Sequence, residues 1–187
     1  MRSLILARHG QTAWNALGRL QGHTDVPLDE VGRGQARALA DALADAGVTA
    51  IWTSDLARAR QTAEIVAAAL ALPAPTLDPD LRERRFGAFE GLTRDECATR
   101  HPEAWRSYTA GTGDPAGAET RADAAARIAR ALDRVASTDG GPALVVNHGG
   151  VLRLWLAQLG DEDVPAIGNA QAYLVEHDGR GYSARLL

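Results

Sequence analysis

Two histidines and two arginines carry the chemistry that this sequence suggests. Arg8 and His9 come directly after a short apolar run, Arg58 follows a second such run, and His148 follows a third. Arginine suits phosphate recognition because its planar fork can hold two oxygens at once. A metal ion would instead be repelled by the neighbouring guanidinium groups. These residue types therefore predict a phosphate site and no metal site.

His9 is the candidate nucleophile of that site. A neutral imidazole can attack phosphorus and form a phosphohistidine, which water then hydrolyses. Arg8 and Arg58 would stabilise the charge that builds on the transferring phosphoryl group, and His148 could donate a hydrogen bond to the same oxygens. Taken singly, each residue is more often structural or a surface residue. The prediction rests on their coincidence at the ends of three expected strands.

A leaving alkoxide also needs a proton, for which a carboxyl group is the expected source. The irregular stretch 78–91 offers four carboxyl groups, those of Asp78, Asp80, Glu83 and Glu90. Spacing alone does not choose among them.

The elements that must position these residues alternate between strand and helix. Apolar runs and turn residues predict five strands and five helical segments. This alternation is typical of a three-layer α/β fold, with a largely parallel central sheet and helices on both faces. Ligands of such sheets bind outside the carboxyl ends of the strands, where the two histidines and two arginines would meet. The expected strands are 4–7, 48–52, 142–147, 170–175 and 182–187, and the expected helices are 29–47, 56–72, 93–105, 119–135 and 150–159.

Several helix boundaries have local signals. Asp29 is expected to cap the first helix, and Ser54 or Asp55 the second. The segment 93–105 should form one or two short helices, broken near Pro102. The stretch 111–117 reads as irregular, and a turn is expected at 178–179, between the last two strands.

Composition bounds the remaining possibilities. The 187 residues suit a single domain over 1–187, and 45% hydrophobic and 24% charged residues are ordinary for a globular protein. A net charge of −4 and the lack of a long apolar run argue against nucleic-acid and membrane partners. All 20 basic residues are arginines, so any anion site must use arginine, histidine or backbone N–H groups. The single cysteine, Cys97, excludes an intrachain disulfide, and the expected compartment is the cytoplasm.

Five blocks along the chain resemble the histidine phosphatase superfamily, also called the phosphoglycerate mutase-like family. They follow the family's order and together span most of the chain. The resemblance implies the phosphoglycerate mutase-like fold. From the irregular sequence of residues 78–118, we expect a loop or lid region over the active site. The blocks are LARHGQTAWN at 6–15, RLQGHTDVPLDEVGRGQA at 19–36, SDLARARQTA at 54–63, LRERRFGAFEG at 81–91 and NHGGVLR at 147–153.

The resemblance assigns roles residue by residue. His9 matches the phosphorylated nucleophile, Arg8 and Arg58 match the phosphate-binding arginines, and His148 matches the second histidine. Glu83 matches the proton donor, a choice that spacing had left open. The expected substrate-binding residues are Asn15, Gln21, Gly22 and Gly149. The resemblance implies no metal and no organic cofactor.

The sequence also departs from the family pattern. Gln11 stands where glutamate is more usual, and Ala118 replaces a glycine in the stretch PAGAET at 115–120, which leaves the role of Glu119 open. Two positions are open for Arg84, Arg85 and Arg106: each side chain could face the mouth of the pocket or lie on the solvated surface.

The expected function is that of a metal-independent phosphomonoesterase acting on a small phosphorylated metabolite. One alternative is a cofactor-dependent phosphoglycerate mutase. The segment Arg106-Ser107-Tyr108 resembles a substrate-binding segment of such mutases, but these enzymes are usually longer than this chain. A non-catalytic binding module is the other, and the retention of all five core residues argues against it. The identity of the substrate stays open, and so does the oligomeric state, with a homodimer among the expectations.

Overall fold

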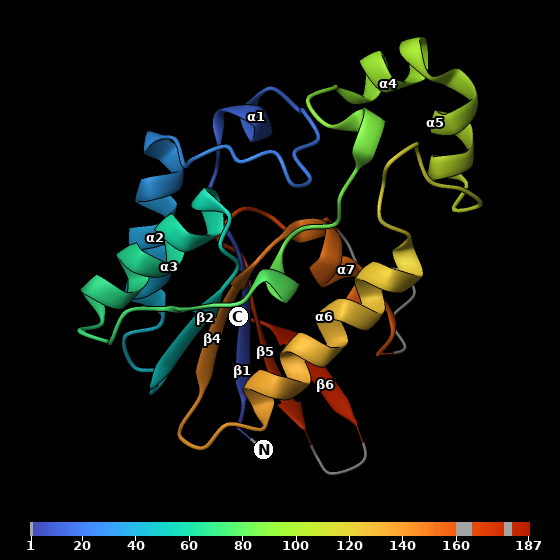
Figure 1. The fold of residues 1–187 in the computed structure, drawn as a ribbon. Helices are drawn as coiled ribbons and strands as arrows, with labels where there is room; N and C mark the ends of the chain where they lie inside the picture. The colour runs from blue at the N-terminus through green and yellow to red at the C-terminus, as the bar shows by residue number, and fades with distance from the viewer. Residues whose placement is uncertain (1, 160–165, 178–180) are drawn as a thin grey trace.

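Six strands form one central sheet in the computed structural model, which describes residues 2–159, 166–177 and 181–187 (Figure 1). The strand order is β3-β2-β4-β1-β5-β6. The first four strands in this order pair in parallel, whereas β5 and β6 are antiparallel, which confirms the largely parallel sheet. The strands are β1 Leu4–Arg8, β2 Ala50–Thr53, β3 Thr76–Leu77, β4 Ala143–Asn147, β5 Ala172–His177 and β6 Tyr182–Leu186.

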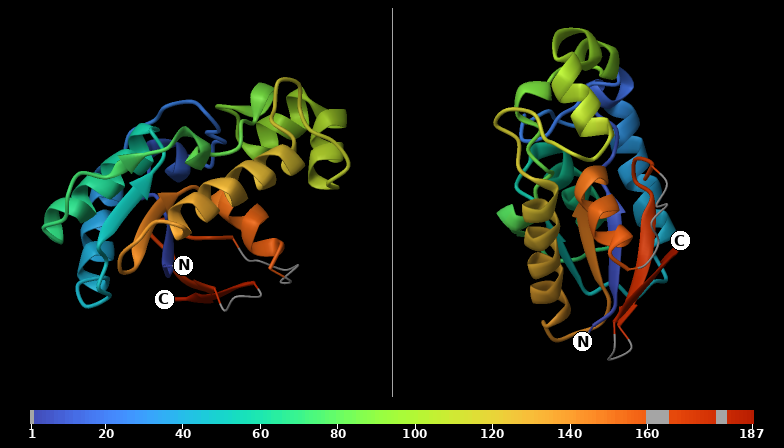
Figure 2. Two further views of the ribbon diagram at one scale, coloured as in Figure 1. Left: turned by 60° about the horizontal axis from the view of Figure 1, so that its bottom comes forward. Right: turned by 90° about the vertical axis from the view of Figure 1, so that its right-hand side faces the viewer.

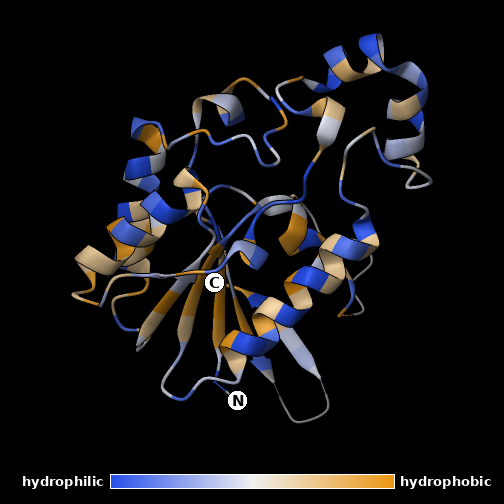
Figure 3. Cartoon of the chain, viewed as in Figure 1, coloured by the Kyte–Doolittle hydropathy of each residue, from blue (hydrophilic) through white to orange (hydrophobic). Residues whose placement is uncertain are grey.

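Helices cover both faces of this sheet because successive side chains of its buried strands point to opposite sides. Leu4 and Leu6 of β1 pack in the core with α6 (Arg121–Ala136) and α7 (Gly149–Ala157). Ile5 of the same strand packs in a second core with α2 (Glu30–Ala42) and α3 (Ala57–Ala69). Figure 3 shows the apolar strands enclosed by helices that are polar on their outer sides. The sequence prediction of three layers is therefore confirmed.

The register of the central strands brings the two histidines to one edge. Arg8 at the end of β1 pairs directly with Asn147 at the end of β4. The backbone N–H of His9 donates to the carbonyl of Asn147 at 2.9 Å. His9 and His148, far apart in sequence, thus follow neighbouring parallel strands at the same point.

Residues 78–118 are here called the outer segment. Their first residues pack beside α6, and Leu81 belongs to the core on that face of the sheet, whereas the later part, including residues 94–109, lies beyond the carboxyl end of the sheet (Figure 2). The outer segment contains two short 3₁₀ helices, Pro79–Leu81 and Gly87–Phe89, followed by α4 (Arg94–Arg100) and α5 (Pro102–Thr109). A small cluster of Phe86, Phe89 and Cys97 is the core of this segment. The predicted break between α4 and α5 at Pro102 is confirmed.

Some sequence predictions were wrong in detail. Neither Ser54 nor Asp55 caps α3, whose N-cap is Leu56 without a side-chain hydrogen bond. The strand β3 and the helix α1 (Ala13–Ala16) were not predicted, because two and four residues are too few to show a periodicity. Asp29 does cap α2, as expected. The turn expected at 178–179 lies outside the described residues.

None of the helices in the described ranges combines the length and apolar character needed to cross a bilayer.

Candidate active site

A cavity of about 220 Å³ lies beyond the carboxyl ends of β1 and β4. Eight of the nine residues predicted for the site line it, and the ninth, His148, lies fully buried beside His9, with the two ring centroids 5.2 Å apart. We call this space the phosphate cavity. The eight lining residues are Arg8, His9, Asn15, Gln21, Gly22, Arg58, Glu83 and Gly149.

His9 is held as a neutral imidazole with one nitrogen turned to the cavity. Its Nδ1 lies 2.7 Å from the carbonyl oxygen of Gly10 and must donate, since a carbonyl only accepts. Burial, reinforced by the charges of Arg58 and Arg8, lowers the pKa of His9 well below its usual value. A neutral ring with its proton on Nδ1 carries a lone pair on Nε2. The local fold thus selects the tautomer that can act as a nucleophile.

The side chain of His148 is held by a hydrogen bond with Ser54. Its Nε2 lies 2.7 Å from the hydroxyl of Ser54, and its Nδ1 is buried without a protein partner in the described part of the chain. Burial and the charge of Arg58 lower the pKa of His148 well below its usual value. When Ser54 donates to Nε2, the proton of the neutral ring sits on Nδ1, which can then donate to an anion.

Arg58 is a buried residue and not the surface residue that its place in a first helical turn suggests. Its side chain is 0% exposed, and it donates to the carbonyls of Gly22 at 2.8 Å and Thr24 at 3.0 Å. Burial lowers its pKa to about 10, so it keeps its charge at neutral pH. Its Nε has no protein partner in the structure as described.

Arg8 is held in a similar way on the other side of His9. Its Nη1 donates to the carbonyl of Ile167 at 2.6 Å, and its Nε is buried without a described protein partner. A Cβ atom on Gly149 would lie 3.2 Å from this Nε, so glycine leaves the guanidinium room. Two guanidinium groups, each with an N–H not used by the protein, therefore flank the candidate nucleophile. An anion would satisfy both.

Glu83 follows the 3₁₀ helix Pro79–Leu81 in the chain, and its carboxyl group packs against the N-terminus of α7 and lines the phosphate cavity. Its carboxyl oxygens accept hydrogen bonds from the backbone N–H groups of Arg84, Gly150 and Val151 at 2.8–3.0 Å. A Cβ on Gly150 would come within 2.5 Å of Oε1, so the carboxyl group can pack this closely only against glycine. The backbone thus fixes the orientation of the carboxyl group.

The other three candidate carboxyl groups are committed to structural contacts. Asp78 and Asp80 both pair with Arg134 at 2.7 Å. Glu90 accepts hydrogen bonds from the backbone of residues 23, 24 and 86 and from the hydroxyl of Thr24. Burial alone would raise the pKa of Glu90, but these hydrogen bonds outweigh it and lower the pKa. The geometry therefore favours Glu83, as the resemblance implied.

Asn15 and Gln21 are oriented by Thr12, which the sequence analysis did not identify. The carboxamide oxygen of Asn15 accepts from the backbone N–H of Thr12, and the hydroxyl of Thr12 donates to the carboxamide oxygen of Gln21 at 3.1 Å. With their oxygens held, both side chains can turn N–H groups towards the cavity. Asn169, also missed, donates to the carbonyl of His9 at 3.0 Å. A capping box at Thr12 is the only local signal that could have found one of them.

Four residues whose roles were open have clear positions. Arg84 is buried and donates to Asp114 and to the carbonyl of Glu119, whereas Arg85 and Arg106 are exposed. Glu119 forms a 2.6 Å ion pair with Arg127, which also donates to the carbonyls of residues 80 and 82. Glu119 therefore braces the loop that carries Glu83.

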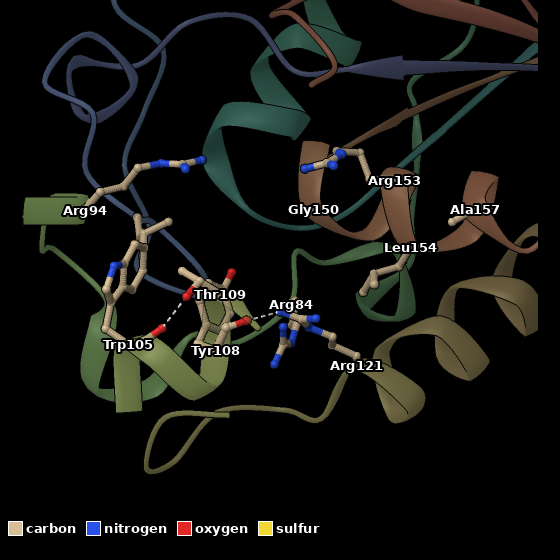
Figure 4. Close-up of a pocket in the computed structure, with 11 residues that line it drawn as sticks. Arg84, Arg94, Trp105, Tyr108, Thr109, Arg121, Gly150, Arg153, Leu154 and Ala157 are labelled. Atoms are coloured by element: carbon tan, nitrogen blue, oxygen red, sulfur yellow. Dashed lines mark hydrogen bonds between the residues drawn. The ribbon is translucent and has the colours of Figure 1, made fainter. Parts of the chain in front are cut away.

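A second cavity of about 560 Å³, here called the outer cavity, adjoins the phosphate cavity (Figure 4). The two share Leu20, Arg94, Gly150 and Arg153. Arg94 and Arg153 were not predicted as site residues. Arg153 belongs to the block NHGGVLR, but neither residue has a local signal that points to a site.

The arrangement as a whole suits an anion. Two charged guanidinium groups and two neutral imidazoles surround one small space, with the N-termini of α3 and α7 adding partial positive charge. The described residues contain no group of three His, Cys, Asp or Glu side chains able to hold a metal ion. A phosphoryl group matches both the charge and the donor geometry.

Comparisons with known proteins agree with this geometry. A metal-independent phosphoserine phosphatase of Arabidopsis thaliana is 40% identical over 155 residues, covering 80% of this chain and 65% of that protein, so this chain spans about two thirds of the plant protein. The probable phosphoglycerate mutase GpmB of Yersinia enterocolitica is 41% identical over 165 residues, covering 85% and 75%.

Solved structures extend the likeness to the complete fold. A mycobacterial glucosyl-3-phosphoglycerate phosphatase has a TM-score of 0.87 and 31% identity, covering 100% of this chain and 98% of that chain. The family model described as the histidine phosphatase superfamily, branch 1, matches residues 4–187. This chain therefore belongs to branch 1 of the histidine phosphatase superfamily.

Proposed function

We propose that this protein is a metal-independent phosphomonoesterase that hydrolyses a small phosphorylated metabolite through a phosphohistidine intermediate. One observation carries the proposal. The neutral His9, with its Nε2 lone pair free to react, lies between the half-buried guanidinium of Arg8 and the buried guanidinium of Arg58, each of which has an Nε without a described protein partner. Family membership and phosphatase-named relatives support the broader class, a phosphoric monoester hydrolase.

In the first step, the Nε2 of His9 attacks phosphorus and the bond between phosphorus and the ester oxygen breaks. Arg8 and Arg58 hold the transferring oxygens, with the Nδ1 of His148 as a further donor. Such donors stabilise the charge that develops in phosphoryl transfer. Glu83, protonated at this point, gives its proton to the leaving oxygen. The products are an alcohol and phosphohistidine.

In the second step, water attacks the phosphohistidine and the bond between phosphorus and Nε2 breaks. The carboxylate of Glu83 takes the proton from this water, which restores its starting state. Inorganic phosphate leaves and His9 returns to the neutral form. The hydrogen bond from Nδ1 to the carbonyl of Gly10 keeps the same nitrogen facing the cavity through both steps.

The position of the outer segment supports a role for it in substrate selection. Phe86 and Arg94 from this segment complete the wall of the phosphate cavity, and Trp105 and Tyr108 line the outer cavity. We therefore propose that residues 78–118 cover the active site and contact the leaving group. The relatives carry different substrates in their names, phosphoserine and glucosyl-3-phosphoglycerate, so they support only the broad class of small phosphorylated substrates. The cytoplasmic location and the homodimer stay predictions.

One experiment tests hydrolysis against mutase activity. The protein is given 3-phosphoglycerate with 2,3-bisphosphoglycerate, and phosphate release is measured beside an enolase-coupled assay of isomerisation. Separate assays measure phosphate release alone in excess EDTA and in the presence of vanadate. We expect phosphate release to be the faster reaction, to be unaffected by EDTA and to be inhibited by vanadate. Isomerisation faster by about tenfold, or about 1.4 kcal/mol in barrier, would favour the mutase instead. Loss of activity in EDTA, restored by a divalent ion, would contradict metal independence.

A further inference from the structure

Residues 167–171, which directly precede β5, form a turn that lies against the end of β1. The carbonyl of Gln171 accepts from the backbone N–H of Arg8 at 3.1 Å, and the N–H of Ala170 donates to the carbonyl of Arg8 at 3.1 Å. The carbonyl of Ile167 accepts from the guanidinium group of the same arginine at 2.6 Å. The 167–171 turn therefore holds both the backbone and the side chain of Arg8.

The conformation of this turn is fixed by its own hydrogen bonds. The backbone N–H of Gly168 donates to Oε1 of Gln171 at 2.7 Å, and the N–H of Gln171 donates back to the carbonyl of Gly168 at 3.2 Å. Ala170 has a φ of 58°, which a residue with a Cβ atom rarely adopts and which persists only where the surrounding contacts enforce it. The side chain of Asn169 therefore leaves the turn in a fixed direction.

The amide group of Asn169 has two acceptors in the candidate active site. Its Nδ2 lies 3.0 Å from the carbonyl oxygen of His9 and 3.3 Å from Oδ1 of Asn15. An amide nitrogen has two hydrogens, so it can donate one to each oxygen. Asn169 is not one of the described residues that line the phosphate cavity. Its effect on the reaction must therefore pass through these two neighbours.

The first neighbour is the candidate nucleophile. The backbone N–H of His9 donates to the carbonyl of Asn147 at 2.9 Å, and its own carbonyl accepts from Asn169 on the other side. The ring is fixed separately, through the contact of Nδ1 with the carbonyl of Gly10. A displacement of about 1 Å in a reacting group can slow a reaction about 10²-fold. The contact with Asn169 thus helps to keep Nε2 where it can reach phosphorus.

The second neighbour is a candidate substrate-binding residue. Oδ1 of Asn15 accepts from the backbone N–H of Thr12 at 3.1 Å and from Asn169, so the N–H groups of Asn15 point away from both and are available to the cavity. We propose that Asn169 is a positioning residue for phosphoryl transfer, which holds the backbone of His9 and turns the amide N–H groups of Asn15 towards the phosphoryl oxygens. This inference rests on the proposed phosphatase function and deepens it.

The direct test exchanges the donor for an acceptor of the same shape. In Asn169→Asp, a carboxylate faces the oxygens of His9 and Asn15, so Asn15 should turn its N–H groups to the carboxylate and its oxygen to the cavity. We expect p-nitrophenol release in a single turnover, with the protein in excess, to slow about 10²-fold. The inhibition constant of vanadate should rise about tenfold, as the loss of a charged hydrogen bond implies.

A second variant removes the donors without adding charge. Asn169→Ala should slow the single turnover about tenfold and raise the inhibition constant of vanadate about threefold, because Thr12 still holds Asn15. This variant decides the test if Asn169→Asp does not fold, which urea unfolding of each variant checks.

Two further proteins separate positioning from charge and from stability. Gln171→Glu adds the same charge to the same turn and keeps an acceptor for the N–H of Gly168, so the losses in Asn169→Asp should exceed its losses at least about tenfold. In the Asn15→Ala background, Asn169→Ala should no longer change the inhibition constant of vanadate but should still slow the single turnover. A purely structural role predicts no such dependence on Asn15.

The outcomes distinguish this inference from the function beneath it. Natural single-turnover rates and vanadate constants in Asn169→Ala would overturn the positioning role and leave the phosphatase intact. The same increase in the vanadate constant with and without Asn15 would also overturn it, because the effect would not pass through that residue. A natural protein that releases no phosphate from any ester would refute the phosphatase itself, before any variant is made.

Discussion

The phosphate cavity and the outer segment are held together by different forces. Around the phosphate cavity, buried side chains are fixed by backbone groups at the end of a sheet, as Arg58 is by two carbonyls and Glu83 by three N–H groups. The outer segment relies on a satellite core of three buried residues, on the buried Arg84, which pairs with Asp114, and on Arg121, whose guanidinium lies over the Tyr108 ring. The candidate catalytic side chains are thus fixed by backbone groups, whereas the part of the outer segment that follows Glu83 depends on a small core of its own.

Removing the candidate nucleophile should have the largest effect on the activity assigned to the phosphate cavity. His9→Ala should fold but lose at least about 10³-fold in turnover, because the covalent route is closed. Phosphate release measures the loss, and an acid-labile, alkali-stable phosphoenzyme should be trapped only from the natural protein. His101→Ala, at the junction of α4 and α5, is the control and should stay within about threefold of the natural rate. Natural activity in His9→Ala would rule out the mechanism.

Removing the candidate acid should have a smaller effect that depends on the substrate. Glu83→Gln cannot donate a proton, so it should slow hydrolysis of an alkyl phosphate about 10²-fold and that of p-nitrophenyl phosphate much less. Steady-state rates on both esters give the comparison. Asp80→Asn, which alters a carboxylate paired with Arg134, should change neither. Equal damage to both esters would mean that Glu83 serves folding or binding.

The satellite core can be loosened without touching the sheet. Phe89 is fully buried against Trp105 and Tyr108, and Phe89→Ala should lower the free energy of unfolding by about 3 kcal/mol. It should also raise KM for the substrate while the inhibition constant of vanadate, which fills only the phosphate cavity, stays nearly constant. Leu132→Ala, on the core-facing side of α6, should lower the free energy of unfolding by a similar amount and leave KM unchanged. A parallel rise in both constants would show that the two regions are not independent.

The buried histidines should make stability depend on pH. The folded pKa values of His9 and His148 lie below their unfolded values, so the unfolded chain binds protons that the folded chain refuses. The free energy of unfolding is therefore unaffected by these histidines above their unfolded pKa and declines as the pH falls below it. Each should cost about 1.4 kcal/mol per pH unit below about pH 6.5. Urea unfolding at pH 7.5, 6.5 and 5.5 in phosphate-free buffer measures the slope.

The matching control replaces the titrating groups. A double variant, His9→Gln with His148→Gln, should show a flatter decline over the same range, and each single variant should fall between. Identical slopes in all four proteins would mean that neither histidine is buried in its neutral form.

Local patterns in the sequence were sufficient for the central layers. The apolar runs of β1 and β4 and the cap at Asp29 encode backbone conformation and a buried face within a few residues, and these features act locally. Because parallel strands end at one edge, the placement of His9 and His148 followed from the strands alone. The resemblance added Glu83, which no spacing rule had chosen.

Only the tertiary structure decided the contacts between segments that are distant in sequence. Ser54 reads as a helix cap and instead holds His148, since a hydroxyl bonds to whichever partner the packing brings near. An arginine in a first helical turn is commonly exposed, but Arg58 is buried because residues 22–24 fold over it and provide carbonyls. The meeting of Arg94 with Arg153 depends on how the outer segment packs over α7. Sequence periodicity records which face of an element is buried, but not which neighbour covers it.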